Sequence, residues 1–287
     1  MHPWVLLNDE IRSADEAMLK PGQIGLLAGW GVFTTLRIYD GVPFSFERHW
    51  ARMKRDAELI HVPFDLEREE VRARLLEMIL RNDALESSVR VCVVRSEKGV
   101  MAGPSLGNPS DLIAFSIDLR GWSDSVALGV QEQGRHAASP FAGTKTLSWS
   151  HNLTMVESAQ QQGYGEVILL NERGEVAECT SANIFAVSKG VTYTPPLRSG
   201  PLPGVTRAIM LEELDEPVEE KILTVDDLHA ADEVFITSST RELLPVDRIL
   251  DKELPAVARG AWPVMEQLRR SLRGYIDRYT AANKGRG

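Results

Sequence analysis

The strongest constraint on the fold is the hydrophobic pattern, which changes between the two halves of this 287-residue chain. In the first half, strand-like and helix-like segments alternate. The stretch "GVFTTLRIYDGVPFSF" predicts two strands joined at Asp40-Gly41, because this dipeptide favours a tight hairpin turn. Two amphipathic helices are predicted next, with apolar residues three or four apart in "FERHWARMKRDAELI" and "DLEREEVRARLLEMIL". Further strands are predicted at "VRVCVVR" and "DLIAFSIDL".

The second half is richer in strands, which we predict at "VALGVQ", "EVILLN", "EVAECTS", "NIFAVS", "GVTYTP" and "DEVFITS". A helix is predicted to begin at "TRAIMLEEL", after the Gly- and Pro-rich loop "RSGPLPG". A last helix is predicted where Leu268, Leu272 and Ile276 recur every four residues. We place a boundary in the polar segment from Arg120 to about Ser125. The prediction is an N-terminal domain of residues 1–120 and a C-terminal domain of residues 126–287.

Composition narrows the function classes. The chain is 43% apolar and carries 32 Lys and Arg against 41 Asp and Glu, a net charge of −9 without a basic block. This balance argues against nucleic acid or an anionic membrane as a partner. With no long apolar segment and no signal-peptide pattern, a cytoplasmic protein is expected. Cys92 and Cys179 lie in apolar runs and are expected to be reduced core thiols, and the scattered histidines predict no metal site.

The stretch "AGTKTLSWSHN" contains Lys145, an unusually isolated cation. Between Arg135 and Glu157 it is the only Asp, Glu, Lys or Arg, although a chain that is 25% charged should place about five there. An ordinary loop accounts for this by chance. The alternative is a lysine kept away from other charges because its amine must be neutral to do chemistry.

Two segments could bind an anion. "GPLPGVTRAIMLE" places Gly204 at a helix start, where free backbone N–H groups and the helix dipole favour a phosphate. Thr206 would serve there as an ordinary helix cap in the alternative interpretation. The turn "TSST", residues 237–240, offers hydroxyl groups after a strand, although such clusters more often only form turns.

Other motifs are weaker. Gly29 and Gly31 in "AGWGVFTT" do not form a dinucleotide fingerprint, because a β-rich run follows them instead of a helix. HExxH and Walker A motifs are absent. In "GEVAECTSANIF", Glu178 alternates with the apolar Ala177 and Cys179. If it is buried it needs a partner; the alternative is a rim residue paired with an arginine.

Taken together and in order, these motifs resemble the class IV aminotransferases. The segments are "GVFTTLR", "RHWARM", "GTKTLSWSHN", "EVAECTSANIF", "TYTPPLRSGPLPGVTR" and "EVFITSSTRELLPV", across roughly residues 5–250. The resemblance implies an α+β, two-domain fold of type IV that uses pyridoxal 5′-phosphate (PLP). The smaller N-terminal α/β domain and the larger strand-rich C-terminal domain would hold the cofactor between them. The group includes branched-chain and D-amino acid aminotransferases and aminodeoxychorismate lyase.

The resemblance also implies a role for each matching residue. Lys145 would form the Schiff base with PLP and shuttle the substrate proton. Glu178 would bind the pyridine nitrogen, and Arg52 would pair with the phosphate. The remaining phosphate contacts would come from backbone donors and hydroxyls at Val205, Thr206, Ser238 and Ser239.

Two departures bear on the substrate. Ser150 stands where branched-chain enzymes carry a tyrosine, and "VCVVRSEKGVM" lacks the arginine–histidine pair of D-amino acid aminotransferases. Thr35 corresponds to a threonine near the substrate in aminodeoxychorismate lyase, and Arg37 shares its strand face. Candidates for binding the substrate carboxylate are, besides these, Arg95, Lys98 and Arg198.

The main hypothesis is therefore a PLP-dependent aminotransferase that moves an amino group from a small amino acid to a 2-oxo acid. The first alternative is a lyase that releases pyruvate and 4-aminobenzoate from aminodeoxychorismate. The second, from another class, is a non-catalytic protein that binds a phosphate ligand. The resemblance further implies a homodimer. The sequence leaves open which donor, acceptor and stereochemistry the enzyme uses.

Overall fold

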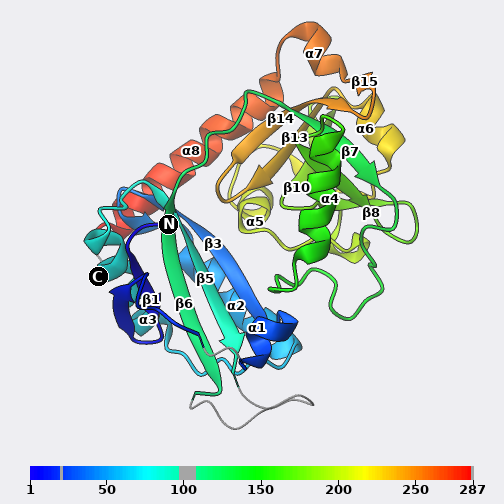
Figure 1. Ribbon diagram of the computed structural model, residues 1–287. Coiled ribbons are helices and arrows are strands. Elements are labelled where there is room, and N and C mark those ends of the chain that lie inside the picture. Colours follow the sequence, from blue (N-terminus) through cyan, green and yellow to red (C-terminus); the bar gives the residue numbers. More distant parts are fainter. Residues whose placement is uncertain (20–21, 97–107, 286–287) are drawn as a thin grey trace. The chain divides into compact units, whose positions relative to one another are not determined.

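The computed structural model describes residues 1–19, 22–96 and 108–285, and it divides into two compact units (Figure 1). The first unit contains Met1–Arg120, Lys145–Trp149 and Ile276–Gly287. The second contains Gly121–Thr144 and Ser150–Tyr275. Two short segments of the predicted C-terminal domain thus belong to the first unit, because they pack and pair with its residues. That each unit is an independent domain stays a prediction.

The first unit is built on an antiparallel sheet in the strand order β2-β1-β6-β5-β3-β4. Its strands are β1 (Trp4–Leu7), β2 (Glu10–Ser13), β3 (Gly31–Tyr39), β4 (Val42–Pro43), β5 (Ser87–Arg95) and β6 (Ser110–Asp118). The predicted hairpin is confirmed. Asp40 and Gly41 join β3 to β4 with φ angles of 48° and 78°, the left-handed conformation that a tight hairpin turn requires.

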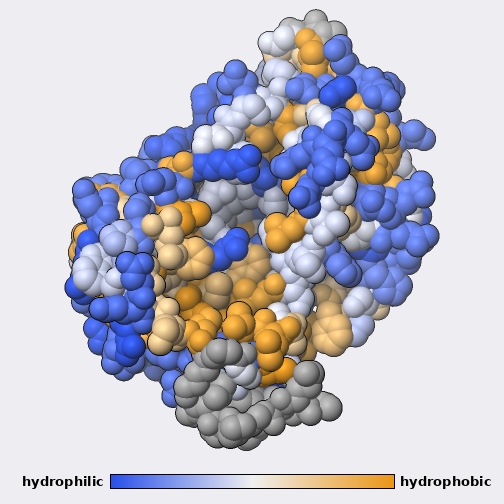
Figure 2. All heavy atoms as spheres, viewed as in Figure 1, coloured by the Kyte–Doolittle hydropathy of each residue, from blue (hydrophilic) through white to orange (hydrophobic). Residues whose placement is uncertain are grey.

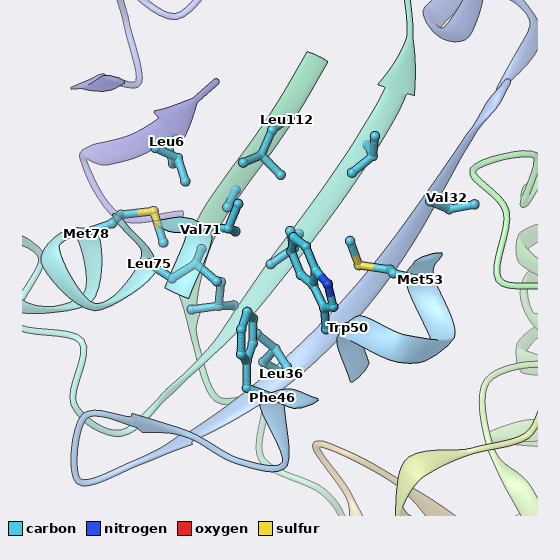
Figure 3. Packing of buried hydrophobic residues seen from close by; sticks show 14 of the residues in the cluster. Leu6, Val32, Leu36, Phe46, Trp50, Met53, Val71, Leu75, Met78 and Leu112 are labelled. Atoms are coloured by element: carbon cyan, nitrogen blue, oxygen red, sulfur yellow. The ribbon is translucent and has the colours of Figure 1, made fainter. Parts of the chain in front are cut away.

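Helices α2 (Phe46–Leu59) and α3 (Arg68–Arg81) pack against this sheet and form the core of the first unit (Figure 3). The predicted apolar faces are confirmed: the buried side chains include Trp50, Met53 and Ala57 on α2, and Val71, Leu75 and Ile79 on α3. A third, short helix is α1 (Ile24–Ala28). Because α2 is fixed by its apolar face, the side chains on its other face have defined positions.

The second unit is built on a mixed sheet in the order β12-β11-β10-β13-β14-β7-β8-β9, with β15 paired to β14. Its strands are β7 (Val126–Gln131), β8 (Glu166–Leu170), β9 (Val176–Cys179), β10 (Asn183–Ser188), β11 (Val191–Thr194), β12 (Val218–Glu220), β13 (Glu233–Ser238), β14 (Glu242–Ile249) and β15 (Lys252–Glu253). The strands predicted in this half are all present. Its core is a cluster of apolar side chains from β7, β8, β10, β13 and β14.

The remaining helices are α4 (Ser150–Gln161), η1 (Leu197–Ser199), α5 (Val205–Glu212), α6 (Val225–Ala230), α7 (Pro255–Arg259) and α8 (Pro263–Asn283). Helix α5 begins one residue before the predicted start. Helix α8 confirms the last predicted helix, since Leu268, Leu272 and Ile276 are all buried. Helix α4 was not predicted, because its apolar face is small: among its residues only Asn152 and Ala159 are buried, and Met155 packs beside Ala159.

Both cysteines are buried and neither forms a disulfide. Burial raises the pKa of the Cys92 thiol to about 11, which keeps it protonated at neutral pH. Hydrophilic side chains cover much of the face of the molecule that Figure 2 shows. Over the described residues, every helix is too short or too polar to cross a membrane.

Candidate active site

Lys145 lies in a short extended segment that runs along the first part of β3. Its carbonyl accepts a hydrogen bond from Phe33 N at 3.0 Å, and Leu147 N donates to Gly31 O at 2.9 Å. Gly31 leaves room for this approach, since a Cβ there would lie 2.5 Å from Leu147 Cδ1 and 2.6 Å from Val93 O. The Lys145 Nζ lies 4.6 Å from the centre of the Phe33 ring and 5.7 Å from that of Trp149.

Isolation of Lys145 along the sequence is not isolation in space. Its backbone N–H donates to Asp56 Oδ2 at 3.0 Å, and Asp56 is a buried residue of α2. Its positive charge also acts on His49, another buried residue of α2. The first unit therefore places the lysine against the polar side of one helix.

Arg52 lies on the same side of α2. Its Nη2 donates to Thr34 Oγ1 at 2.9 Å, and that hydroxyl lies 2.7 Å from His49 Nδ1. Burial, and then the charges of Arg52 and Lys145, hold the pKa of His49 well below its usual value of 6.5. The imidazole is therefore neutral at neutral pH and adds no positive charge beside Arg52. Arg52 and Lys145 are two cations of the first unit that an anionic ligand could contact.

Glu178 lies in β9 of the second unit. It is buried, as the first interpretation of the sequence required, and its partner is an arginine, as the second one proposed. Its Oε1 accepts from Arg135 Nε at 2.9 Å, and its Oε2 accepts from Leu202 N at 3.0 Å. Arg135 also donates to Asn152 Oδ1 at 3.3 Å. Asn152 is fixed in turn by a hydrogen bond to Thr180 O at 2.6 Å. The carboxylate is thus held at a fixed orientation.

The loop from Leu202 to Gly204 connects Glu178 to the start of α5. Leu202 O accepts from both Gly204 N, at 2.8 Å, and Asn183 Nδ2, at 2.9 Å. Gly204 is the N-cap of α5, and no side chain caps this helix end among the described residues. The first N–H groups of α5, at Val205 and Thr206, therefore form an anion-binding end of the kind that helix N-termini provide.

The hydroxyl-rich turn after β13 lies beside the same loop. Asn183 of β10 pairs with Thr237 of β13. Ser238 and Ser239 are the two residues that follow Thr237, so they lie close to Asn183. Ser238 Oγ accepts from Arg241 N at 3.3 Å. Arg241 is anchored by a buried ion pair with Glu166, at 3.1 Å, and lies over the Trp122 ring at 4.1 Å. One contiguous region of the second unit thus contains the predicted carboxylate and the predicted phosphate donors.

Comparison with known proteins identifies the family. The model of the family Amino-transferase class IV matches residues 31–249. The chain belongs to this family. It is 31% identical, over 252 residues, to a protein of Methanocaldococcus jannaschii provisionally named branched-chain-amino-acid aminotransferase, covering 85% of this chain and 87% of the relative. It is 28% identical to a Bacillus licheniformis D-alanine aminotransferase over 281 residues, 96% of this chain and 98% of the relative.

Solved structures share the fold. The branched-chain amino acid aminotransferase of Escherichia coli superposes with a TM-score of 0.87 at 24% identity, over 96% of this chain and 95% of that chain. A Legionella pneumophila protein provisionally named 4-amino-4-deoxychorismate lyase superposes with a TM-score of 0.83 at 21% identity, over 91% and 96% of the two chains. The predicted type IV fold is confirmed. The chain is an enzyme of a PLP-dependent family, and its substrates are amino acids and 2-oxo acids.

The residues of this class IV aminotransferase fit PLP chemically. The cofactor has a ring nitrogen that pairs with a carboxylate and a phosphate that needs several N–H and O–H donors. Glu178 is a buried carboxylate, and the uncapped end of α5 lies one short loop away. Gly204 is required there, since a Cβ would lie 2.0 Å from Asn183 Oδ1.

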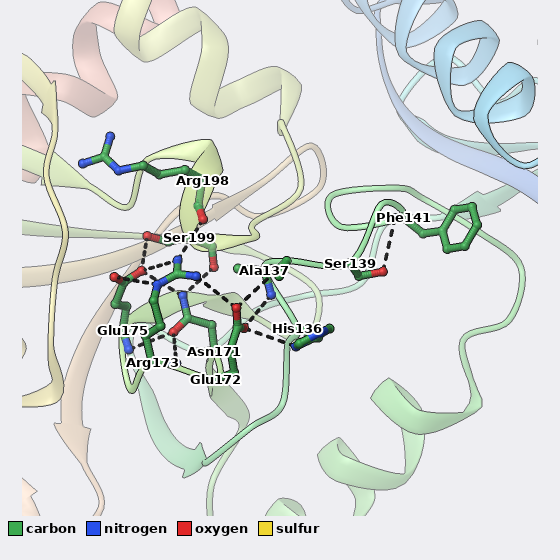
Figure 4. A network of polar contacts seen from close by, with 11 residues as sticks. His136, Ala137, Ser139, Phe141, Asn171, Glu172, Arg173, Glu175, Arg198 and Ser199 are labelled. Atoms are coloured by element: carbon green, nitrogen blue, oxygen red, sulfur yellow. Dashed lines mark hydrogen bonds and ion pairs between the residues drawn. The ribbon is translucent and has the colours of Figure 1, made fainter.

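A polar network anchors the loop that leads towards Lys145 (Figure 4). Glu172 accepts hydrogen bonds from the backbone N–H groups of Ala137, at 2.7 Å, and Ala138, at 3.2 Å. Arg173 pairs with both Glu172 and Glu175. Its hydrogen bond, followed by those of Asn171 and Ser199, lowers the pKa of Glu175 to about 2. This network was not predicted from the sequence, and it fixes the chain just after Arg135.

The cations nominated for the substrate carboxylate differ in their surroundings. Arg37 pairs with Glu86 at 2.6 Å and lies over the Tyr39 ring, so its charge is already neutralised. Arg95 lies over the Trp30 ring at 4.2 Å and donates to His61 O. Arg198 is exposed, and Figure 4 shows its guanidinium pointing away from the network. Lys98 lies outside the described residues.

Sequence reasoning missed Arg90, which is opposite Thr35 in the pairing of β3 with β5. Its Cζ lies 4.6 Å from the centre of the Phe33 ring, the ring that Lys145 Nζ also contacts at 4.6 Å. Because both atoms lie 4.6 Å from the same ring centre, the distance from Arg90 Cζ to Lys145 Nζ is at most twice that value. Within the described residues Arg90 forms no ion pair. The half-buried Thr35 lies on the same face of the sheet as Arg90, because directly paired residues share a face.

Proposed function

We propose that this protein is an aminotransferase in which Lys145 binds PLP covalently and moves the substrate proton. When bound, PLP supplies an aldehyde that takes up the substrate amine and a ring that accepts the electrons left when the Cα–H bond breaks. Glu178 holds the protonated ring nitrogen, because a carboxylate there stabilises its positive charge. The phosphate is bound by the Arg52 guanidinium, by the N–H groups of Val205 and Thr206, and by the hydroxyls of Ser238 and Ser239.

The observation that carries this proposal is the link between Glu178 and the start of α5. A buried carboxylate and an uncapped helix N-terminus are joined through Leu202 and Gly204. A ligand that satisfies both ends must have a positive or proton-donating end and an anionic end. PLP, the cofactor of the family, has these two features.

Borohydride trapping tests the proposal directly. The purified protein is loaded with PLP, reduced and digested, and the labelled peptide is identified by mass spectrometry. The expected label is on Lys145, and the Lys145→Ala variant should take up none. A label on another lysine, or a protein that stays colourless with PLP, would overturn the assignment. A non-catalytic phosphate-binding protein predicts instead that Lys145→Ala keeps all ligand-dependent behaviour.

A panel of amino donors with 2-oxoglutarate as the acceptor tests the reaction itself. The expected result is amino transfer from at least one small amino acid. The lyase alternative is supported by Ser150, which begins α4 where branched-chain enzymes carry a tyrosine, and by Thr35 on the Phe33 face of β3. Pyruvate release from aminodeoxychorismate without any oxo acid, together with no amino transfer, would favour the lyase.

For the substrate carboxylate we propose Arg90, with Thr35 beside it, in preference to Arg37 and Arg95. The support is its position at the Phe33 ring together with Lys145, and the absence of an ion-pair partner among the described residues. A guanidinium matches a carboxylate in shape and charge and forms two parallel hydrogen bonds to it. Arg37 has a structural role in this proposal, because Glu86 occupies its charge.

We also propose that the active form is a homodimer, as the family resemblance implies. Light scattering combined with activity at the same protein concentration tests this. A monomeric mass with full activity would refute it. A cytoplasmic location stays a prediction.

A further inference from the structure

Asp56 is a buried acid in the first unit to which the proposed mechanism assigns no role. Only 1% of its side chain is exposed. Its Oδ2 accepts the backbone N–H of Lys145 at 3.0 Å, while Oδ1 accepts from Arg55 Nε at 2.9 Å. The two oxygens thus have separate partners, one on the lysine segment and one that neutralises the charge. Burying an ionised carboxylate is unfavourable unless it is paired in this way.

The position of Asp56 on α2 connects it to Arg52. His49, Arg52 and Asp56 are spaced by three and four residues, so they form one stripe along the helix. Trp50, Met53 and Ala57 form the apolar stripe that fixes α2 in the core. Arg52 and Asp56 are four residues apart on α2, about 6 Å along the helix axis. The same helix therefore carries Arg52, the proposed phosphate ligand, and Asp56, which accepts a hydrogen bond from the Lys145 backbone.

The lysine segment is short, and its pairing with β3 is a single bridge, Val32 with Thr146. Hydrogen bonds from Ser148 Oγ to Ala28 O and Gly29 O, and the packing of Leu147 and Trp149, hold the residues after the lysine. The N–H of Lys145 is held by the Asp56 carboxylate, at the residue whose side chain reacts. A hydrogen bond to an ionised acceptor is stronger than one between neutral groups, so Asp56 is a firm anchor for so short a segment.

We propose that Asp56 is a positioning residue, which fixes the main chain of Lys145 at a constant place relative to Arg52. This inference rests on the proposed function. The lysine amine would have to stay within reach of the aldehyde of bound PLP, and its reach depends on the position of its backbone. A constant distance between Arg52, which binds the phosphate in this proposal, and the Lys145 backbone would keep the amine within reach of the aldehyde. Asp56 acts through the hydrogen bond that it accepts, and Arg55 balances its charge.

Three variants test this role. Asp56→Ala removes the acceptor, Asp56→Asn keeps a carbonyl acceptor but removes the charge, and Glu58→Ala is the control because Glu58 is an exposed acid on the same helix. For each variant we measure kcat, the KM for the amino donor, and the hydrogen exchange of the Lys145 backbone amide. Amide exchange is read in the protein without cofactor as well, so this measurement does not depend on activity.

In Asp56→Ala we expect the Lys145 amide to exchange at least about tenfold faster. We expect kcat to fall about 10- to 100-fold, with the KM changed less than about threefold, because a misplaced reacting group lowers the rate more than substrate binding. Asp56→Asn should keep kcat within about fivefold of wild type, since it still accepts the hydrogen bond. Glu58→Ala should match wild type in every measurement.

Several results would overturn the inference. One is wild-type exchange and kcat in Asp56→Ala, and another is an equal loss of kcat in Asp56→Asn and Asp56→Ala. If Asp56→Ala does not show a cooperative thermal transition, Asp56→Ser replaces it, with the same criteria. Borohydride trapping on the wild-type protein separates the two levels of failure. A label on Lys145 with an unaffected Asp56→Ala variant refutes only the positioning role, whereas a label elsewhere refutes the proposed function.

Discussion

The Glu178 carboxylate and the Arg135 guanidinium form an ion pair whose side chains are 8% and 23% exposed, with Oε1 2.9 Å from Nε. The arginine occupies one oxygen and the Leu202 N–H the other, so the orientation of the carboxylate is set by two donors from different segments. Because a carboxylate can accept about four hydrogen bonds, both donors leave room for a further one from a ligand. Arg135 is therefore part of the candidate site, although it does not contact the substrate in the proposed mechanism.

Arg135→Gln should weaken PLP binding and lower the stability of the second unit. The Glu178 carboxylate would lose its charged partner while staying buried, which destabilises a protein by about 1–3 kcal/mol. PLP titration and urea unfolding measure the two effects. The control is Lys252→Gln, which removes an exposed cation in the same unit and should change neither. Unchanged PLP affinity in Arg135→Gln would show that Arg135 does not hold Glu178 for the cofactor.

Gly204→Ala should impair the anion site at α5. The added Cβ would lie 2.0 Å from Asn183 Oδ1, so either the start of the helix or Asn183 must move. The expected result is a loss of PLP affinity of at least about tenfold, measured by equilibrium dialysis, because the N–H groups of Val205 and Thr206 would be displaced. Gly121→Ala is the matched control, since a Cβ there meets no atom within 4 Å. Equal affinities in the two variants would argue against a phosphate at this helix end.

Local patterns were sufficient to predict most of the secondary structure. The Asp40-Gly41 hairpin and the apolar faces of α2 and α3 are confirmed because each depends on residues within one or two helical turns. Helix α4 was missed for the same reason: its apolar face is limited to Met155 and Ala159, which is too little to give a periodic signal. The fold type was predicted from the family resemblance and not from the periodicity.

The partners of the candidate site residues could not be predicted from local patterns. Asp56 and Lys145 are 89 positions apart, and Arg135 and Glu178 are 43 apart. Such pairs form only when separate elements fold together, and a single sequence carries no sign of them. The isolation of Lys145 was a true observation along the chain, but Asp56 contacts its backbone in the folded protein. His49 lies within the motif "RHWARM", yet only its burial reveals that it is neutral.

His49 should make stability depend on pH. Its pKa in the folded protein lies well below 6.5, its value in the unfolded chain, so the unfolded chain binds more protons as the pH falls below 6.5. The free energy of unfolding should then decrease with falling pH, by at most about 1.4 kcal/mol per pH unit from this group. Above about pH 6.5 His49 is neutral in both the folded and the unfolded protein, so it no longer changes the free energy of unfolding with pH.

Urea unfolding at about pH 5 and about pH 7.5 measures this effect. His49→Gln should show a smaller difference between the two pH values than wild type. His151→Gln, at an exposed position of α4, should follow wild type. An identical pH dependence in His49→Gln and wild type would contradict the burial of a neutral imidazole.

Arg90 should determine how tightly the substrate carboxylate is bound. If its guanidinium pairs with that carboxylate, Arg90→Gln loses a charge-assisted interaction of about 1.5–3 kcal/mol, which corresponds to about a 10- to 150-fold increase in the KM of the amino donor. Arg90→Lys should recover part of the loss, because it keeps the charge but not the paired geometry. Arg37→Gln serves for comparison. It should lower thermal stability by leaving Glu86 without its cation, but leave the KM within about threefold. A raised KM in Arg37→Gln together with a wild-type KM in Arg90→Gln would contradict this assignment. Arg37 would then be the residue that binds the substrate carboxylate, on the face of β3 that it shares with Thr35.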